Sequence, residues 1–296
     1  MPIIGDIQYI NIFIFTMRTA HHIIISILIM NILSCTSETT TVISYNIRYD
    51  NKWDEKNSWS TRKESIVRIF EKYSPSFIGT QEGLAHQIHY IDSVLGKYDY
   101  IGVGREDGIK KGEFCAIYYE SDTYKVIESS TFWLSDTPEK VSIGWDAALE
   151  RICTYGLFEN TMNKKRIWVF NTHFDHMGEI ARIKSSELIL ERINDLNNFS
   201  GPIILMGDFN SLPNSGPVHT ILKEFKDAFN ISINKPKGPK GTYNGFNEDQ
   251  PIEKRIDYVY LKNIDVLNHE HIDDRLENNN HISDHLPVMV DIIFKP

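Results

Sequence analysis

Apolar residues from Val42 onward are grouped in short runs that end in Asn, Asp, Glu, Gly or His. Runs of this kind, rich in Val, Ile, Tyr and Phe, are typical of buried strands. Strands are predicted at residues 41–46, 76–82, 114–120, 123–129, 152–159, 165–175, 202–209, 255–262 and 286–294. The segments 114–129 and 152–175 each contain two runs in close succession, which predicts two antiparallel hairpins.

Three other segments repeat their apolar residues at helical spacing. One helix is expected behind a capping box of Thr61 and Glu64, with the apolar residues of 66–73 on one face. A second covers residues 84–95 and a third covers 179–196. Hairpins mixed with helical crossovers imply mixed sheets, and the strands are too many for one open sheet. The predicted fold is therefore α/β (α+β), a four-layer sandwich of two packed mixed sheets flanked by helices.

The N-terminal segment has a different pattern. "MRTAHHIIISILIMNILSC", from Met17 to Cys35, has a basic start, an apolar run and a serine before the cysteine. It resembles a bacterial lipoprotein signal in which Cys35 is lipidated and becomes the mature N-terminus, and the run is short for a membrane span. Leu33 and the apolar extension before Met17 depart from that pattern. The alternatives are an uncleaved membrane anchor or a buried first helix.

The domain organisation follows from this pattern. Residues 1–35 are predicted to be the signal segment, 36–41 a polar tether, and 42–296 one catalytic domain, because no long linker or repeat interrupts them. The protein is expected to be exported and to face the periplasm or cell surface, with its N-terminal lipid as its only membrane attachment.

Composition narrows the possible partners. The chain of 296 residues has a formal net charge of −9, which argues against tight nonspecific binding of duplex DNA. Its three cysteines, Cys35, Cys115 and Cys153, form no even-numbered framework and no CxxC spacing, so disulfides are not expected to be a main source of stability. We expect a monomer that acts on a phosphorylated substrate.

Polar side chains occur where the predicted strands end. In "ILMGDFNSLP", Asp208 and Asn210 follow an apolar run and would share one face of an extended chain. Either the pair grips a polar ligand, or the segment is simply a turn. The other strand-end residues are Asn46 in "SYNIRYDN", Glu82 in "GTQEG", His173 and Asp175 in "NTHFDH", Asp257 in "RIDYVY", and Asp284 with His285 in "SDHLPV".

Each of these motifs alone is explained by a turn, by a helix-start acid or by an exposed surface pair. Together, in the order YN, QE, NTH, GDFN, IDY and SDH, they resemble the endonuclease/exonuclease/phosphatase superfamily, which has the deoxyribonuclease-I-like fold. The resemblance covers residues 42–294. Longer segments such as "NIRYDNKWDEKNSWSTRK" and "GVGREDGIKKGEF" resemble a bacterial subgroup of secreted proteins and lipoproteins.

The residue types point to a hard metal ion. Asn46, Glu82 and Asp284 offer only carboxylate or amide oxygens, which suit Mg²⁺ or Mn²⁺ and suit zinc poorly. Glu82 is the predicted principal ligand, with Asn46 and Asp284 beside it or in its water shell. Such a metal would polarise a phosphoryl oxygen.

The resemblance implies the catalytic roles. Asp208 orients or deprotonates the attacking water, and Asn210 donates to a phosphoryl oxygen. His173 faces the same phosphate. Asp257 holds His285 in a carboxylate–imidazole pair, and His285 acts as hydrogen-bond donor or proton carrier.

Substrate contacts are predicted less directly. Asp175 would share a face with His173 and support the metal shell or the leaving group. Arg151 and Arg182 lie within subgroup-like motifs and are candidates for gripping a phosphate or another anionic group. Arg105 is more simply explained as a surface arginine.

The predicted function is hydrolysis of a phosphodiester or phosphomonoester by metal-assisted attack of water. The alternative is a catalytically silent surface lipoprotein that binds a phosphorylated glycan or a protein, which would be expected to have lost some of the catalytic residues. A membrane-attacking sphingomyelinase would need an exposed apolar hairpin, and the sequence after the signal region contains no long apolar loop with aromatic tips.

Overall fold

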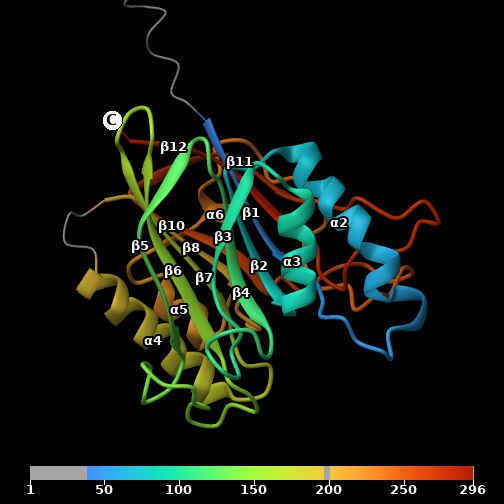
Figure 1. Cartoon of the computed structure of the whole chain (residues 1–296), viewed down its shortest axis with the longest axis horizontal. Coiled ribbons are helices and arrows are strands. Elements are labelled where there is room, and N and C mark those ends of the chain that lie inside the picture. The colour runs from blue at the N-terminus through green and yellow to red at the C-terminus, as the bar shows by residue number, and fades with distance from the viewer. Residues whose placement is uncertain (1–38, 197–200, 296) are drawn as a thin grey trace, which may run out of the picture. The chain divides into compact units, whose positions relative to one another are not determined.

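Two six-stranded mixed sheets form the centre of the structure, a computed structural model that describes residues 39–196 and 201–295 (Figure 1). Across sheet A the strands are β11 (Ile264–His271), β12 (Val288–Phe294), β1 (Thr39–Asn46), β2 (Phe77–Gly83), β4 (Phe114–Glu120) and β3 (Tyr98–Ile101). Across sheet B they are β5 (Tyr124–Trp133), β6 (Ile152–Asn160), β7 (Arg166–His173), β8 (Ile203–Asp208), β10 (Asp257–Lys262) and β9 (Lys226–Asp227). The pairs β1–β2 and β7–β8 are parallel, and the other neighbouring strands described here are antiparallel.

Helices cover the outer face of each sheet, which confirms the predicted four layers (Figure 1). Sheet A packs against α2 (Trp59–Tyr73) and α3 (Ala85–Val94), and sheet B packs against α4 (Glu179–Leu196) and α5 (Gly216–Ile221). The short η1 (Glu55–Asn57) and α6 (Ala228–Ile231) lie in connections.

The core between the sheets follows from strand alternation. In β1, Val42 packs between the two sheets, whereas the next residue, Ile43, packs under the helices of sheet A. In β8, Ile204 and Met206 likewise face the inter-sheet core, and Leu205 faces α4 and α5. Strands in this position are apolar on both faces, which is why they were recognisable as continuous apolar runs.

Strand β1 begins at Thr39, so the end of the predicted tether is part of the fold. Thr39, Thr40 and Thr41 pair with residues of β12 that lie opposite them. The predicted signal segment and Cys35 lie outside the described residues. Within the described ranges, no helix has both the length and the apolar character needed to cross a membrane.

Two local predictions are wrong. The capping box of Thr61 and Glu64 does not form, because the turn of η1 leads into a helix that begins at Trp59 with Ser58 at its N-cap. The predicted hairpin at 114–129 does not form either. Strand β4 has β2 on one side and β3 on the other, so the chain crosses to sheet B and β5 pairs with β6. The second predicted hairpin, β6–β7, is confirmed.

Candidate active site

Three strands of sheet B end at the same level, with a polar residue at each end. The register places His173 of β7 beside Asp208 of β8, and Asp208 opposite Asp257 of β10. All three side chains are buried. The strand-end motifs NTH, GDFN and IDY therefore meet because neighbouring strands are paired in this register.

Sheet A supplies the other half of the site. Asn46 at the end of β1 pairs with Gln81 of β2, and the next residue, Glu82, lies where the β2–β4 register shifts. Glu82 has a left-handed backbone with φ of 66°. A bulge of this kind redirects a side chain away from simple alternation, and here it aims the Glu82 carboxylate at the strand ends of sheet B.

A buried amide pair joins the two sheets directly behind the site. Gln81 Nε2 donates to Asn171 Oδ1 at 2.7 Å, and Asn171 Nδ2 donates to the backbone oxygens of Thr80 and Ala116 at 2.9 and 2.8 Å. Both amides belong to the QE and NTH motifs. Gln81 Nε2 also lies 3.2 Å from the Ser44 hydroxyl, to which it donates. These residues fix the spacing between the halves of the site, because buried amides with several hydrogen-bond partners have little freedom to move.

Arg62 holds two loops of the site from behind. This fully buried side chain donates to the backbone oxygens of Ile47 at 2.8 Å, Arg48 at 3.2 Å, Ile282 at 3.1 Å and Asn57 at 2.7 Å. It therefore ties the segment after β1 to the segment that precedes the SDH motif.

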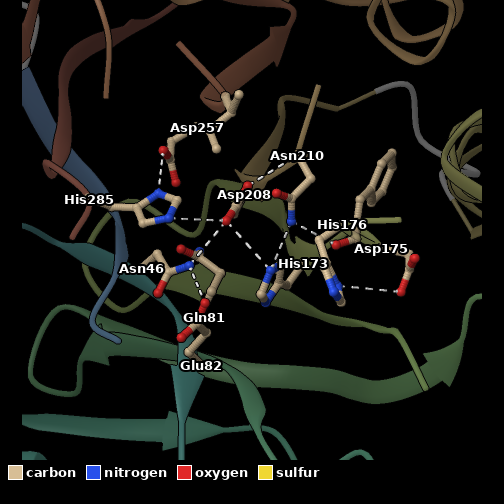
Figure 2. A network of polar contacts seen from close by, with 12 residues as sticks. Asn46, Gln81, Glu82, His173, Asp175, His176, Asp208, Asn210, Asp257 and His285 are labelled. Carbon is tan, nitrogen blue, oxygen red and sulfur yellow. Dashed lines mark hydrogen bonds and ion pairs between the residues drawn. The ribbon is translucent and has the colours of Figure 1, made fainter. Parts of the chain in front are cut away.

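The strand ends enclose a cavity of about 660 Å³. Its walls include the predicted site residues Glu82, Arg151, His173, Asp208, Asn210, Asp284 and His285, together with Arg48, Arg105, Glu113, His176, Leu149, Leu212, Tyr243, Lys254 and Ile256. Figure 2 shows Asn46, Glu82, His173, Asn210 and His285 arranged around the Asp208 carboxylate.

Asn46 connects the two halves through its amide. Its Nδ2 donates to Glu82 Oε1 and to Asp208 Oδ2, each at 3.0 Å, while its Oδ1 accepts from the Arg48 backbone N–H at 3.0 Å. Only the nitrogen can serve two carboxylates, so this orientation is the one the network requires. Asn46 thus positions Glu82 and Asp208 and points its oxygen at the Arg48 backbone N–H. Its place beside the metal or in the metal's water shell stays a prediction.

Glu82 and Asp284 form the pair best suited to a hard cation. Arg48 Nη1 lies between them, 3.9 Å from Glu82 Oε2 and 3.6 Å from Asp284 Oδ2. The pKa of Asp284 is raised to about 6, because burial and the charge of Glu82 together outweigh the lowering effect of His285 and the nearby arginines. Two neighbouring carboxylates fit Mg²⁺ or Mn²⁺, because both offer hard oxygen ligands and the cation offsets their negative charge.

A second group of ligand atoms belongs to Asp208, Asp257 and His285, which lie within 4.8 Å of one another. His285 Nδ1 lies 2.8 Å from Asp257 Oδ2, and its Nε2 lies 3.7 Å from Asp208 Oδ2. Burial lowers the pKa of His285, but the two carboxylates outweigh it and raise that pKa well above its usual value. A protonated imidazole cannot bind a metal, so this group is better suited to holding protons.

Asp208 has the environment of a general base. Burial, and then the charge of Asp257, raise the pKa of Asp208 to about 7. A carboxylate with a pKa near neutrality can both accept and release a proton at that pH. Its Oδ1 accepts the Asn210 backbone N–H at 2.8 Å, while Oδ2 lies 3.5 Å from His173 Nε2.

His173 is a neutral imidazole in this network. Burial, and then the charges of Arg151 and Arg105, lower the pKa of His173 well below its usual value. Asn210 Nδ2 donates to His173 Nε2 at 3.1 Å, which leaves the imidazole hydrogen on Nδ1, 3.8 Å from Glu113 Oε2.

Glu113 is a cavity residue that the sequence did not predict, and Arg105 is a cavity residue that was considered as a phosphate contact but explained more simply as a surface arginine. Arg105, expected on the surface, is buried and donates to both Glu113 oxygens at 2.7 and 2.9 Å. Burial and then the charge of Glu82 raise the pKa of Glu113 to about 7. The only sequence signal was the position of Glu113 directly before the apolar run of β4.

The three predicted substrate contacts, Arg151, Asp175 and Arg182, lie at different distances from the cavity. Arg151 lines the cavity, and its Nε donates to Asp175 Oδ2 at 3.3 Å. Asp175 is buried apart from the Asp208 cluster (Figure 2) and also accepts the Met177 and Gly178 backbone N–H groups. It therefore holds Arg151 and its own loop. Arg182 donates to the Asp175 backbone oxygen at 3.0 Å and is not among the cavity residues described above.

A sandwich of two mixed sheets with Asp, Asn, Glu and His side chains gathered at converging strand ends is the architecture of hydrolases that act on phosphoester bonds. Residues 43–285 match the Endonuclease/Exonuclease/phosphatase family, and the chain belongs to that family. The superfamily predicted from the six motifs is thereby confirmed, and the secreted or lipoprotein subgroup stays a prediction.

Three similar proteins give this result context. A mannosyl-6-phosphatase of Bacteroides thetaiotaomicron is 34% identical, with a TM-score of 0.83 over 86% of this chain and 100% of that chain. An endonuclease/exonuclease/phosphatase family protein of the same organism is 33% identical, with a TM-score of 0.84 over 87% and 96%. A protein of Acanthamoeba polyphaga mimivirus is 27% identical over 78% of this chain and 91% of its own length.

Proposed function

We propose that this protein is a divalent-metal-dependent phosphoesterase that hydrolyses a phosphomonoester carried by a sugar. The observation that carries the reaction class is the convergence of Glu82, His173, Asp208, Asn210 and His285 on one cavity. A silent binding protein would not need a buried carboxylate held between two imidazoles, since burying such charges lowers stability.

The chain's own residues account for the proton and charge movements. Asp208 accepts a proton from the attacking water, because its Oδ2 faces the cavity residues His173 and His285 and its raised pKa matches that task. Protonated His285 donates a hydrogen bond to a phosphoryl oxygen, where negative charge increases in the transition state. Asn210 donates a second one when substrate replaces His173 Nε2 as the partner of its Nδ2, whose other hydrogen is on the Phe174 backbone oxygen. Asp257 keeps His285 oriented and protonated.

Glu82 and Asp284 would hold the metal. When bound, Mg²⁺ or Mn²⁺ would polarise a phosphoryl oxygen and offset the negative charge of the site.

The sugar phosphate is proposed from the mannosyl-6-phosphatase likeness and from the dimensions of the cavity. A volume of about 660 Å³ falls in the range of small-ligand sites. The acidic chain disfavours long nucleic acids.

Substrate class can be tested with residues 36–296 in the presence of Mg²⁺ and, separately, Mn²⁺. We expect release of phosphate from mannose 6-phosphate or glucose 6-phosphate, and much slower cleavage of bis-p-nitrophenyl phosphate, single-stranded oligonucleotides and plasmid DNA. The Asp208→Asn variant serves as the control for contaminating phosphatases. Faster cleavage of the diesters would contradict the monoester assignment and keep the reaction class, whereas no cleavage of any compound would count against both.

We also propose that the protein is exported and lipidated at Cys35, on the basis of the N-terminal sequence pattern. Metabolic labelling with a radioactive fatty acid should label the full chain and not the Cys35→Ala variant, and both should be compared by fractionation of membranes. Equal labelling of the two would disprove lipidation at this residue.

A further inference from the structure

Arg48 is a cavity residue to which the proposed reaction assigns no role. Its Nε and Nη2 donate to the two oxygens of Asp54 at 3.0 and 3.1 Å, which is a bidentate pair. The guanidinium plane is therefore fixed by Asp54. Nη1 is the remaining nitrogen, and it is directed at the carboxylates of Glu82 and Asp284.

The contacts of Nη1 are ionic and long. At 3.9 Å from Glu82 and 3.6 Å from Asp284 it is too far for a good hydrogen bond to either. No hydrogen bond of Nη1 is present within residues 39–196 and 201–295. Arg48 thus keeps an unused pair of N–H donors beside the two acids that would bind the metal.

The backbone of Arg48 is built to hold this position. Its φ is 57°, in the left-handed region that a non-glycine residue seldom adopts. Its carbonyl accepts from Arg62 Nη2 at 3.2 Å and from Gln87 Nε2 at 3.0 Å, and its N–H donates to Asn46 at 3.0 Å. Strain that is held by several bonds next to a site is typical of functional residues.

Charge decides what this donor can do. Among the lysines and arginines of the described residues, Arg48 is the one that lies within 4 Å of both Glu82 and Asp284, and its charge partly neutralises them. With a divalent cation on the same two carboxylates, Arg48 would no longer be needed as their counter-ion and would be repelled. Its Nη1 would then be available to bind a phosphate oxygen of the substrate.

We propose that Arg48 is a phosphate-binding residue that serves as the counter-ion of Glu82 and Asp284 until metal and substrate bind. This inference rests on the proposed function, since it assumes a metal on those carboxylates. It makes two predictions of opposite sign: removing Arg48 strengthens metal binding and weakens phosphate binding. A residue with a purely structural role would weaken both.

The test measures Mn²⁺ binding by isothermal titration calorimetry, and then binding of inorganic phosphate to the Mn²⁺-saturated protein. For Arg48→Gln we expect Mn²⁺ to bind about tenfold more tightly, because one nearby repulsive charge is lost. Phosphate should bind about 10-fold to 100-fold more weakly, the usual effect of losing a hydrogen bond to a charged group. Arg48→Lys, which keeps the charge, should leave Mn²⁺ binding close to wild type and restore part of the phosphate binding.

Lys254→Gln is the matched control, because it removes one positive charge from the same cavity at a residue for which no ion pair to Glu82 or Asp284 is present in the described chain. It should change Mn²⁺ affinity much less than Arg48→Gln does. Melting temperatures in EDTA verify that each variant is folded. Equal or weaker Mn²⁺ binding by Arg48→Gln, or unchanged phosphate binding, would overturn the inference. Absence of Mn²⁺ binding by the wild type would instead refute the proposed metal site.

Discussion

The Asp208→Asn variant should turn over substrate about 10²-fold to 10⁴-fold more slowly than wild type, the usual effect of losing a positioned proton acceptor. KM should change little, because an amide of the same shape keeps the hydrogen bond to the Asn210 N–H and the loss falls on the transition state. The melting temperature should change little, because two effects oppose each other. Replacing a buried carboxylate beside Asp257 lowers charge repulsion, but an amide with its oxygen on the Asn210 N–H cannot accept the hydrogen bond from Asn46 Nδ2.

The control for this prediction is Asp122→Asn, a change of the same type in the exposed turn between β4 and β5. It should alter neither kcat nor the melting temperature. If Asp208 were only a turn residue, Asp208→Asn would leave turnover per folded molecule intact. That outcome would remove Asp208 from the proposed mechanism.

Chelation should have an effect of similar size. Activity in EDTA should fall about 10³-fold or more, since the metal is expected to contribute several kcal/mol of transition-state stabilisation, and added Mg²⁺ or Mn²⁺ should restore it. Mn²⁺ should also raise the melting temperature of the wild type, because a ligand that binds only the folded state stabilises it.

The Glu82→Gln variant tests whether the metal binds at the proposed Glu82–Asp284 site or at another site in the protein. The variant should stay folded in EDTA and lose most of the increase in melting temperature caused by Mn²⁺. Glu277→Gln is the control, because Glu277 is an exposed acid that does not line the cavity. This variant should keep the full increase in melting temperature with Mn²⁺. Full wild-type activity in EDTA would exclude the metal mechanism. If Mn²⁺ raised the melting temperature of Glu82→Gln as much as that of the wild type, the metal would bind elsewhere. The group of Asp208, Asp257 and His285 would then be the first alternative site.

Much of the fold could be predicted because its central strands are buried on both faces and read as apolar runs. Strands β3, β9 and β11 were missed for the opposite reason. All three are edge strands, and β11, with the sequence "IDVLNHEH", carries polar residues and a register shift. Edge strands are less buried and need few apolar residues, so their sequences lack the apolar runs from which the central strands were predicted.

The site could be predicted where a motif ends a strand, and not where a loop carries the residue. The "GDFN" segment was interpreted either as a ligand-binding pair or as a turn, and in the structure it is both. Asp208 Oδ1 makes the turn bond to the Asn210 N–H, while Oδ2 accepts from Asn46 and faces the histidines. Arg105 and Glu113 lie on a loop and before a strand, and only the three-dimensional structure pairs them.

Three residues of the cavity, Arg48, Glu82 and Asn210, have left-handed backbones with φ of 57°, 66° and 45°. For a residue other than glycine this conformation costs about 1 kcal/mol or more. The hydrogen bonds of these side chains, such as the bidentate Arg48–Asp54 pair, offset part of that cost. The rest is stability that the fold gives up to present these side chains to the cavity, so stability and turnover are expected to oppose each other at these positions.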